Sequence, residues 1–384
     1  MCAGRRIGGV MMQVRAAVLR ESGAEKPYGT SQPIDVTTLQ LDPPGPGELL
    51  VRVRAAGLCH SDLSVINGSR PRPLPLALGH EAAGEVLEAE QGSGFEPGDH
   101  VVLAFVPSCG ECERCVAGRP ALCGPAAAAN TKGALLGGGM RFTEEDGSRP
   151  YHHLGVSAFA EHIVVSSRSA VKVDPEVPFE IAALFGCAVL TGAGAALYSA
   201  QIRPGDSVAV FGLGGVGLAA LLAAKAAGAS TVVAVDVVEH KRKLASELGA
   251  THTVEGGPDA VQRVRELTSG GAEKVLDTTG VVHVLQQAYD ATRSGGTTVT
   301  VGLPDPEARL TLPALSIVAE ERTLRGSYLG SCVPRRDVPR FIQMYQSGAL
   351  PVDALLSHRL GLDEINAGFD RLDDGTAVRQ VVLM

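Results

Sequence analysis

Four closely spaced cysteines constrain the fold of this chain more strongly than any other feature of its sequence. They are Cys109, Cys112, Cys115 and Cys123. Neither a strand nor a helix needs this spacing for packing, so we expect a tight loop that closes around one ion. Four thiolates make a closed tetrahedral zinc site without a position for substrate, whereas an iron–sulfur cluster, the weaker alternative, usually has other spacings. The pattern predicts a structural zinc that keeps a lobe with little apolar core folded.

The composition favours a globular protein in a reducing compartment. The sequence of 384 residues contains eight cysteines, is 45% hydrophobic and carries a formal net charge of -8. Such an acidic balance offers no basic surface for nucleic acid, so no nucleic-acid partner is expected. We expect the cysteines to bind metal rather than to form disulfides, as is typical of cytoplasmic proteins.

No segment of the sequence predicts export or membrane insertion. The start, Met1 to Arg6, has two arginines but no long apolar run, and Met11 and Met12 follow as alternative starts. The uncharged runs 181–202 and 208–224 contain several glycines, so we interpret both as protein core rather than as membrane spans. We therefore expect a cytoplasmic protein without a membrane partner.

Two kinds of pattern divide the chain. The first part alternates short apolar strands with turns, as in residues 48–54, and favours a β-rich domain. From about residue 190, buried strands such as 207–211 alternate with helices such as 218–227, which predicts a doubly wound parallel sheet. The polar, glycine-rich stretch 124–149 is expected to be a surface loop. The expected domains are 1–188 and 189–328, with 329–384 returning to the first.

A glycine-rich turn between a strand and a helix of the second domain predicts a dinucleotide site. It has the sequence Gly212-Leu213-Gly214-Gly215-Val216-Gly217. The first glycine makes the turn, the second lets the backbone approach a pyrophosphate, and the last lets the helix pack on the strand. The free N–H groups at the start of the helix favour phosphate. Asp236, at the end of the next strand, can accept hydrogen bonds from a ribose and repel a 2′-phosphate, which favours NAD over NADP.

A second group of residues predicts a metal site with an open position. Cys59-His60-Ser61-Asp62 is followed by Gly79-His80-Glu81 and, much later, by Cys187. Cys59, His80 and Cys187 would supply two sulfurs and one nitrogen. Such a set leaves one corner of a zinc tetrahedron open, as a catalytic zinc requires.

Both cysteine sets and the glycine turn resemble the zinc-dependent medium-chain alcohol dehydrogenases. The resemblance runs from about residue 13 to the C-terminus and rests on five motifs, at 57–62, 79–81, 109–123, 185–192 and 211–217. The long middle loop resembles the animal-type, class III-like branch, whose members are often dimers. The resemblance implies an α/β protein with a GroES-like β-rich catalytic domain, a Rossmann domain and an active site in the cleft between them.

The resemblance also implies roles at two zinc ions per chain. The catalytic zinc would be bound by Cys59, His80 and Cys187, and the structural zinc by the four clustered cysteines. Glu81 matches a carboxylate that can approach the catalytic metal. Asp62 would orient the histidine ligand, because such partners fix the ring of a metal-bound imidazole. Ser61 matches the hydroxyl that takes the proton of the alcohol.

Further positions match contacts to the cofactor and the substrate in this family. His60 and Arg379 would contact the pyrophosphate. Thr191 would lie beside the nicotinamide, and Lys241 would contact the ribose. Phe105 matches an aromatic wall of the substrate pocket. Arg70 borders the mouth of the pocket, where it could select a polar or acidic substrate or face solvent.

One departure from the family pattern concerns the proton path. Ser64 stands where the animal-type enzymes have a histidine that ends the proton relay. The path could end at the ribose and water, or it could use His60. The resemblance implies zinc-dependent, NAD-linked oxidation of a primary or secondary alcohol to the aldehyde or ketone, and the reverse reduction, through a zinc-bound alkoxide and hydride transfer to the nicotinamide.

Two other functions stay open. One is a thiol-dependent formaldehyde dehydrogenase of the glutathione or mycothiol type, which uses the same chemistry on a thiol–formaldehyde adduct. The other is a non-catalytic NAD-binding sensor that keeps its zinc ions for structure. The expected partners are a small alcohol or aldehyde, NAD(H), and a second copy of the chain in a homodimer, with a homotetramer as the alternative.

Overall fold

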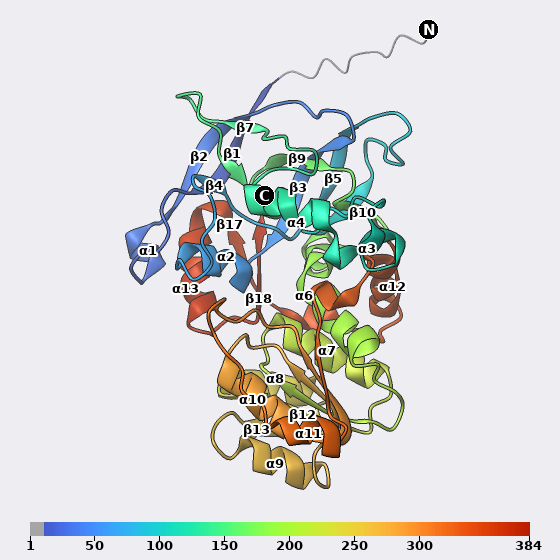
Figure 1. Ribbon diagram of the computed structural model, residues 1–384. Coiled ribbons are helices and arrows are strands. Elements are labelled where there is room, and N and C mark those ends of the chain that lie inside the picture. Colours follow the sequence, from blue (N-terminus) through green and yellow to red (C-terminus); the bar gives the residue numbers. More distant parts are fainter. Residues whose placement is uncertain (1–10) are drawn as a thin grey trace. The chain divides into compact units, whose positions relative to one another are not determined.

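A computed structural model describes residues 11–384 of the chain (Figure 1). The first ten residues, including Met1 to Arg6 for which no export pattern was found, lie outside the described residues. The described chain divides into two compact units. The first comprises residues 11–186, His358–Asp374 and Gln380–Met384, and the second comprises Cys187–Ser357 and Gly375–Arg379.

Two sheets form the first unit. The five-stranded sheet has the order β7-β2-β1-β4-β8 and consists of β1 (Met12–Leu19), β2 (Ile34–Leu41), β4 (Leu76–Ala77), β7 (Phe142–Thr143) and β8 (Tyr151–His152). The seven-stranded sheet has the order β10-β6-β5-β3-β18-β17, with β9 also paired to β3. Its strands are β3 (Glu48–Gly57), β5 (Ala82–Ala89), β6 (His100–Leu103), β9 (His162–Ser166), β10 (Ala170–Lys172), β17 (Leu356–Gly361) and β18 (Arg379–Leu383).

The core of the first unit is made by the inward faces of these strands. In β3, Leu49, Val51 and Val53 are buried while Arg52 is exposed. Alternate side chains of a strand point to opposite faces, so this pattern places one face of β3 against the core. The short helices around the sheets are α1 (Tyr28–Ser31), α2 (His60–Ile66), α3 (Glu113–Val116), α4 (Gly124–Lys132), α5 (Phe179–Ala182) and α13 (Ile365–Asp373).

Helix α4 corrects the expectation that 124–149 is a loop throughout. The helix has a proline, Pro125, in its first turn, where the fixed φ of proline suits a helix start. A run of alanines follows, and alanine is the residue that favours helix most. Gly133, with a φ of +66°, ends the helix in the left-handed conformation. The rest of the stretch contains β7 and connecting turns.

The second unit is built on one six-stranded parallel sheet. Its order is β13-β12-β11-β14-β15-β16, the doubly wound order expected of a Rossmann domain. The strands are β11 (Ser207–Phe211), β12 (Thr231–Asp236), β13 (His252–Glu255), β14 (Ala272–Asp277), β15 (Thr292–Thr300) and β16 (Thr323–Gly326). The helices are α6 (Ala188–Gly194), α7 (Gly215–Ala226), α8 (Glu239–Glu247), α9 (Ala260–Leu267), α10 (Val282–Asp290), α11 (Ala314–Ala319) and α12 (Pro334–Gln346).

Residues 329–357 pack within the second unit, so the chain returns to the first unit at His358, later than the residue 329 that we expected. Helix α12 packs beside α6. The hydroxyl of Tyr198, just after α6, donates to Asp337 at 3.0 Å, and its ring stacks on Phe341. These tertiary contacts hold α12 in the second unit.

Among the described residues, no single helix combines the length and hydropathy that crossing a membrane requires. The bent pair Phe179–Gly186 and Ala188–Ser199, which turn by 53°, meets that criterion only when the two segments are taken together.

Candidate metal and cofactor sites

The four clustered cysteines lie together in the first unit. The Sγ atom of Cys112 is 3.5 Å from that of Cys115 and 3.9 Å from that of Cys123. The Sγ atoms of Cys109 and Cys115 are also 3.9 Å apart. With Zn–S bonds of about 2.3 Å, a tetrahedron places its sulfur ligands about 3.8 Å from one another. The observed separations therefore fit a single zinc ion.

Backbone N–H groups prepare this loop for thiolates. The N–H groups of Glu111 and Cys112 donate to Cys109 Sγ at 3.5 and 3.3 Å and lower the pKa of the Cys109 thiol. The N–H group of Cys115 lowers the pKa of Cys112 to about 6. Burial raises the pKa of Cys115 and of Cys123, so a cation is needed before all four can be thiolates.

A buried carboxylate organises the second candidate metal site. Asp62, in the first turn of α2, is fully buried. It accepts the N–H group of Gly79 at 3.1 Å and lies 3.1 Å from His80 Nδ1 and 2.9 Å from His153 Nδ1. Burial alone would raise the pKa of Asp62, but the two imidazoles hold it well below its usual range. Asp62 is therefore a carboxylate with several donors around it.

His80 is placed so that its second ring nitrogen can bind a metal. Burial lowers the pKa of His80, whereas Asp62 and Cys59 raise it to about 10, so metal binding at this ring releases a proton. Because Nδ1 faces Asp62, the lone pair for a metal is on Nε2, which is buried and has no nitrogen or oxygen partner. Cys187 directly follows Gly186, the last residue of the first unit. Cys59, His80 and Cys187 each offer one ligand atom, and these atoms lie within 4.8 Å of one another.

An aromatic side chain packs against the candidate ligand. The rings of Phe105 and His80 meet edge to face, with their centroids 5.5 Å apart. The carbonyl oxygen of Phe105 accepts a hydrogen bond of 2.9 Å from Asn130 Nδ2 of α4. Phe105 is thus buried beside the candidate metal position, and helix α4 holds its backbone through Asn130.

The other predicted residues of the first unit lie on or near α2. His60 is exposed and Ser61 is half-buried in the first turn of this helix, while Glu81 is fully buried beside His80. The hydroxyl of Ser64 donates to His60 O at 2.7 Å, so its proton is used in a hydrogen bond within helix α2. Arg70 is half-buried, and its backbone N–H donates to Ser64 O at 2.9 Å.

The glycine turn of the second unit has the geometry of a phosphate cradle. Gly212 has a φ of +88°, which glycine adopts without strain. A Cβ on Gly217 would lie 1.8 Å from Gly212 O, so the helix can approach the turn only with glycine there. A Cβ on Gly214 would meet nothing within 4 Å, which leaves open space above the turn. Helix α7 starts at Gly215, and the first turn of a helix offers N–H groups that can bind a phosphate.

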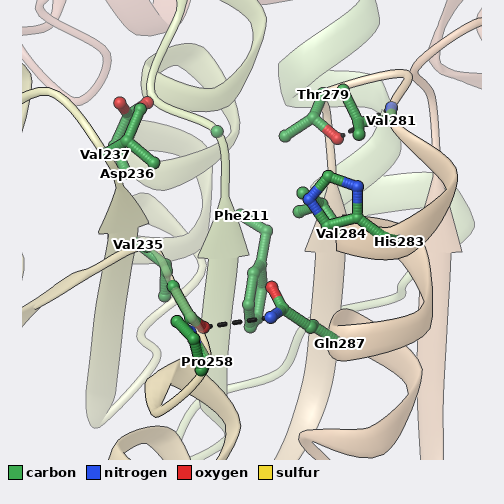
Figure 2. Close-up of a pocket in the computed structure, with 13 residues that line it drawn as sticks. Phe211, Val235, Asp236, Val237, Pro258, Thr279, Val281, His283, Val284 and Gln287 are labelled. Atoms are coloured by element: carbon green, nitrogen blue, oxygen red, sulfur yellow. Dashed lines mark hydrogen bonds between the residues drawn. The ribbon is translucent and has the colours of Figure 1, made fainter.

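Asp236 joins the end of β12 to this turn. Its Oδ2 accepts the N–H group of Leu213 at 2.6 Å, and its Oδ1 accepts that of Val238 at 2.8 Å. Asp236 also lines a cavity of about 640 Å³, shown in Figure 2. Apolar side chains from Val235 and Val284 line the same cavity, and Gln287 donates to Gly257 O at its edge. A flat base and a ribose fit such a lining of apolar walls with a carboxylate at the rim.

The remaining cofactor candidates of the second unit are also buried. Lys241 is 9% exposed, and burial lowers its pKa while Asp236 raises it. Lys241 is therefore not a solvated helix charge. A Cβ on Gly215 would lie 2.1 Å from Arg379 Cδ, so the Arg379 side chain runs alongside the start of α7. Thr191 is buried within α6.

Comparison with known proteins follows this division of the chain. A family model described as alcohol dehydrogenase GroES-like domain matches residues 45–175, and one described as zinc-binding dehydrogenase matches residues 215–347. The NDMA-dependent alcohol dehydrogenase of Amycolatopsis methanolica is 39% identical over 97% of this chain and 99% of its own length. The S-(hydroxymethyl)glutathione dehydrogenase of Paracoccus denitrificans is 34% identical over 97% of this chain and 100% of its own.

Solved structures give the same result. An alcohol dehydrogenase zinc-binding domain protein from Burkholderia ambifaria superposes with a TM-score of 0.92 at 36% identity, covering 98% of this chain and 100% of that one. Benzyl alcohol dehydrogenase from Acinetobacter calcoaceticus has a TM-score of 0.88 at 32% identity, covering 97% of this chain and 99% of that one. The chain belongs to the zinc-dependent medium-chain alcohol dehydrogenases, enzymes that interconvert alcohols with aldehydes or ketones and use zinc and a nicotinamide cofactor. The α/β fold with GroES-like and Rossmann domains is confirmed.

One residue beside the metal site had no role in the sequence-based prediction. His153 contacts Asp62 in the folded chain, yet 91 residues separate the two in sequence. The neighbouring pair His152-His153 is the only local signal, and nothing in its spacing tells which ring turns toward Asp62.

The cysteine cluster yields a first prediction. We expect Cys112→Ala to lower the zinc content by one ion per chain and to make residues 105–125 accessible to protease. Structural zinc in small sites contributes on the order of 10 kcal/mol of folding free energy, so the lobe should not stay folded without it. Metal analysis and limited proteolysis measure both effects. Cys332→Ala, at a buried cysteine outside both groups, is the matched control. A lobe that resists protease without its zinc would contradict the prediction.

Proposed function

We propose that this chain oxidises a primary or secondary alcohol to the aldehyde or ketone with NAD, reversibly, and with two zinc ions per chain. The observation that supports this most is the buried Asp62–His80 pair beside Cys59 and Cys187. Cys59, His80 and Cys187 would give a metal three protein ligands and leave a fourth position for the substrate oxygen. The tetrahedral spacing of the other four cysteines supports the second zinc.

The chain's own residues would position and deprotonate the substrate. Asp62 holds the Nδ1 proton of His80, which keeps the lone pair of Nε2 available to a metal. Ser61, two residues after Cys59 and half-buried, would accept the proton of the alcohol hydroxyl. Phe105 would keep water away from the reacting carbon. When bound, zinc supplies a Lewis acid that lowers the pKa of the alcohol, and NAD supplies the acceptor for the hydride.

A thiol-dependent formaldehyde dehydrogenase is the second candidate. It is favoured by the 34% identity to an S-(hydroxymethyl)glutathione dehydrogenase over the whole chain. The half-buried Arg70 could meet a carboxylate of the thiol carrier.

A substrate panel tests the proposal. We expect NADH, followed at 340 nm, to form with benzyl or straight-chain alcohols, and formaldehyde oxidation not to require added glutathione or mycothiol. A reaction that needs the thiol would favour the second candidate instead. NDMA is included as an additional acceptor, because one relative is named NDMA-dependent.

The same panel is run with Cys187→Ala. Loss of a metal ligand should lower kcat on the order of 1,000-fold, since a Lewis acid contributes several kcal/mol to the transition state. NAD binding, measured by calorimetry, should persist because the glycine turn lies elsewhere. Turnover that survives the substitution would remove the zinc mechanism.

Cofactor choice yields a further prediction. We propose NAD rather than NADP because the carboxylate of Asp236 lies at the rim of the cavity beside the glycine turn. Asp236→Asn keeps an acceptor for Leu213 but removes the charge, so the preference for NAD in kcat/KM should fall about 10- to 100-fold. Glu239→Gln removes a charge three residues later, at an exposed position, and should change the ratio little. A wild-type enzyme that prefers NADP would exclude this role of Asp236.

We also propose a cytoplasmic homodimer. The seven described cysteines form no disulfide with one another, as expected in a reducing compartment. Strand β16 is the edge of the parallel sheet, and an open edge can pair with a second copy. Exposed apolar side chains lie on β16 and on the preceding helix α11, namely Leu315, Ile317, Val318 and Leu324. A patch of this kind favours a self-complementary, two-fold interface.

The interface can be tested by sedimentation. We expect wild-type protein to sediment at twice the mass of one chain. The double variant Val318→Asp/Leu324→Asp should sediment as a monomer, because a two-fold interface would bury the new carboxylates of one chain against those of the other. Val116→Asp changes an equally exposed valine in the zinc lobe and should leave the dimer intact. A double variant that remains dimeric would place the interface elsewhere.

A further inference from the structure

Two imidazole rings share one carboxylate beside the candidate catalytic metal site. His80 Nδ1 lies 3.1 Å and His153 Nδ1 lies 2.9 Å from Asp62. The two rings stand edge to face, with their centroids 5.5 Å apart and their planes at 84°. All three side chains are at most 2% exposed. Both Nδ1 atoms therefore face the same carboxylate, that of His80 in hydrogen-bond geometry and that of His153 at close distance without it.

The backbone around His153 is built to hold its ring in place. Its N–H group donates to Ser157 Oγ at 3.2 Å. Leu154 and Ser157 have φ values of +50° and +57°, and Gly155 lies between them at +67°. Non-glycine residues persist in this conformation only where their surroundings fix it. The surroundings of this turn therefore fix the position of the His153 ring.

The neighbouring His152 forms hydrogen bonds within the same turn rather than with Asp62. His152 Nε2 accepts the N–H group of Arg141 at 3.1 Å, and its Nδ1 lies 2.9 Å from Ser157 Oγ. Burial lowers the pKa of His152 to about 3, so the ring is neutral. His152 thus contacts the turn, whereas His153 faces the carboxylate of Asp62.

The Nδ1 atom of His153 lies close to the Asp62 carboxylate, although the pair does not meet hydrogen-bond geometry. A lone pair on Nδ1 would repel the carboxylate at 2.9 Å, so Nδ1 carries the proton. An N–H group at this position helps to stabilise the buried carboxylate beside His80.

We propose that His153 is a positioning residue of the catalytic metal site, which acts through Asp62 to hold His80 with Nε2 toward the metal. The inference rests on the proposed function. Without His153, only the Gly79 N–H group and His80 hold the Asp62 carboxylate, so the carboxylate is freer to rotate and the ligand orientation is less well fixed. Changes to such outer partners typically lower metal affinity or activity 10- to 100-fold.

Zinc retention in holoenzyme variants tests the proposal. Purified wild type, His153→Leu, His153→Phe and His153→Asn are mixed with excess chelator, and zinc release is followed together with kcat. The amide nitrogen of asparagine can replace Nδ1 as a donor, whereas leucine and phenylalanine only fill the space. His152→Leu is the matched control in the same turn.

We expect one of the two zinc ions to leave His153→Leu and His153→Phe about 10 to 100 times faster than wild type, with a parallel loss of kcat. The other zinc should leave at the wild-type rate and serves as an internal reference. His153→Asn should retain zinc within about threefold of wild type. His152→Leu should unfold at a lower temperature but keep the wild-type rate of zinc release.

Equal zinc release in wild type and both apolar variants would overturn the inference, as would an asparagine variant no better than leucine. If leucine prevents folding, the phenylalanine and asparagine variants decide the question alone. A wild-type enzyme with two zinc ions but no turnover on any alcohol would refute the proposed function instead, while the zinc-release comparison would still judge His153.

Discussion

The burial of one charge, on Asp62, determines how the first unit arranges its candidate metal ligands. A carboxylate taken out of water is strongly unfavourable unless donors replace its hydration. The chain supplies the N–H group of Gly79 and the imidazole of His80 for this purpose, and the Nδ1 atom of His153 lies 2.9 Å away. Since these groups meet at the same carboxylate, the segment before β5 that carries His80 and the turn that carries His153 are fixed relative to α2. The ligand geometry follows from satisfying that charge.

The second unit uses a carboxylate in a comparable way at its cofactor turn. Asp236 bonds the N–H groups of both Leu213 and Val238, so the end of β12 and the glycine turn after β11 form one rigid edge. A helix start with free N–H groups and an open space over Gly214 then provides a place for phosphate before any ligand arrives. Preorganisation of this kind spares binding energy that ordering the loop would consume.

Local chemistry explains which features could be predicted from the sequence. The spacing of Cys109 to Cys123 and the glycines at 212–217 carry their meaning within a few residues, because the loop and the turn are themselves local. Helix α4 was missed because glycine and polar residues around it outweighed Pro125 and its alanines. The packing of 329–357 and the contact of His153 with Asp62 are tertiary events, set by burial between distant segments, and no local spacing encodes them.

The two candidate metal sites of the first unit are connected through helix α4. Cys123 belongs to the zinc cluster and is also the residue from which α4 begins. Asn130 of that helix donates to Phe105 O, and the Phe105 ring packs edge to face on His80. If the four cysteines hold a zinc ion as proposed, its loss would release the start of α4, and with it the support of the ring beside His80. In the proposed enzyme, the four-cysteine site would thereby support the geometry at His80 through packed and hydrogen-bonded side chains rather than through a shared ligand.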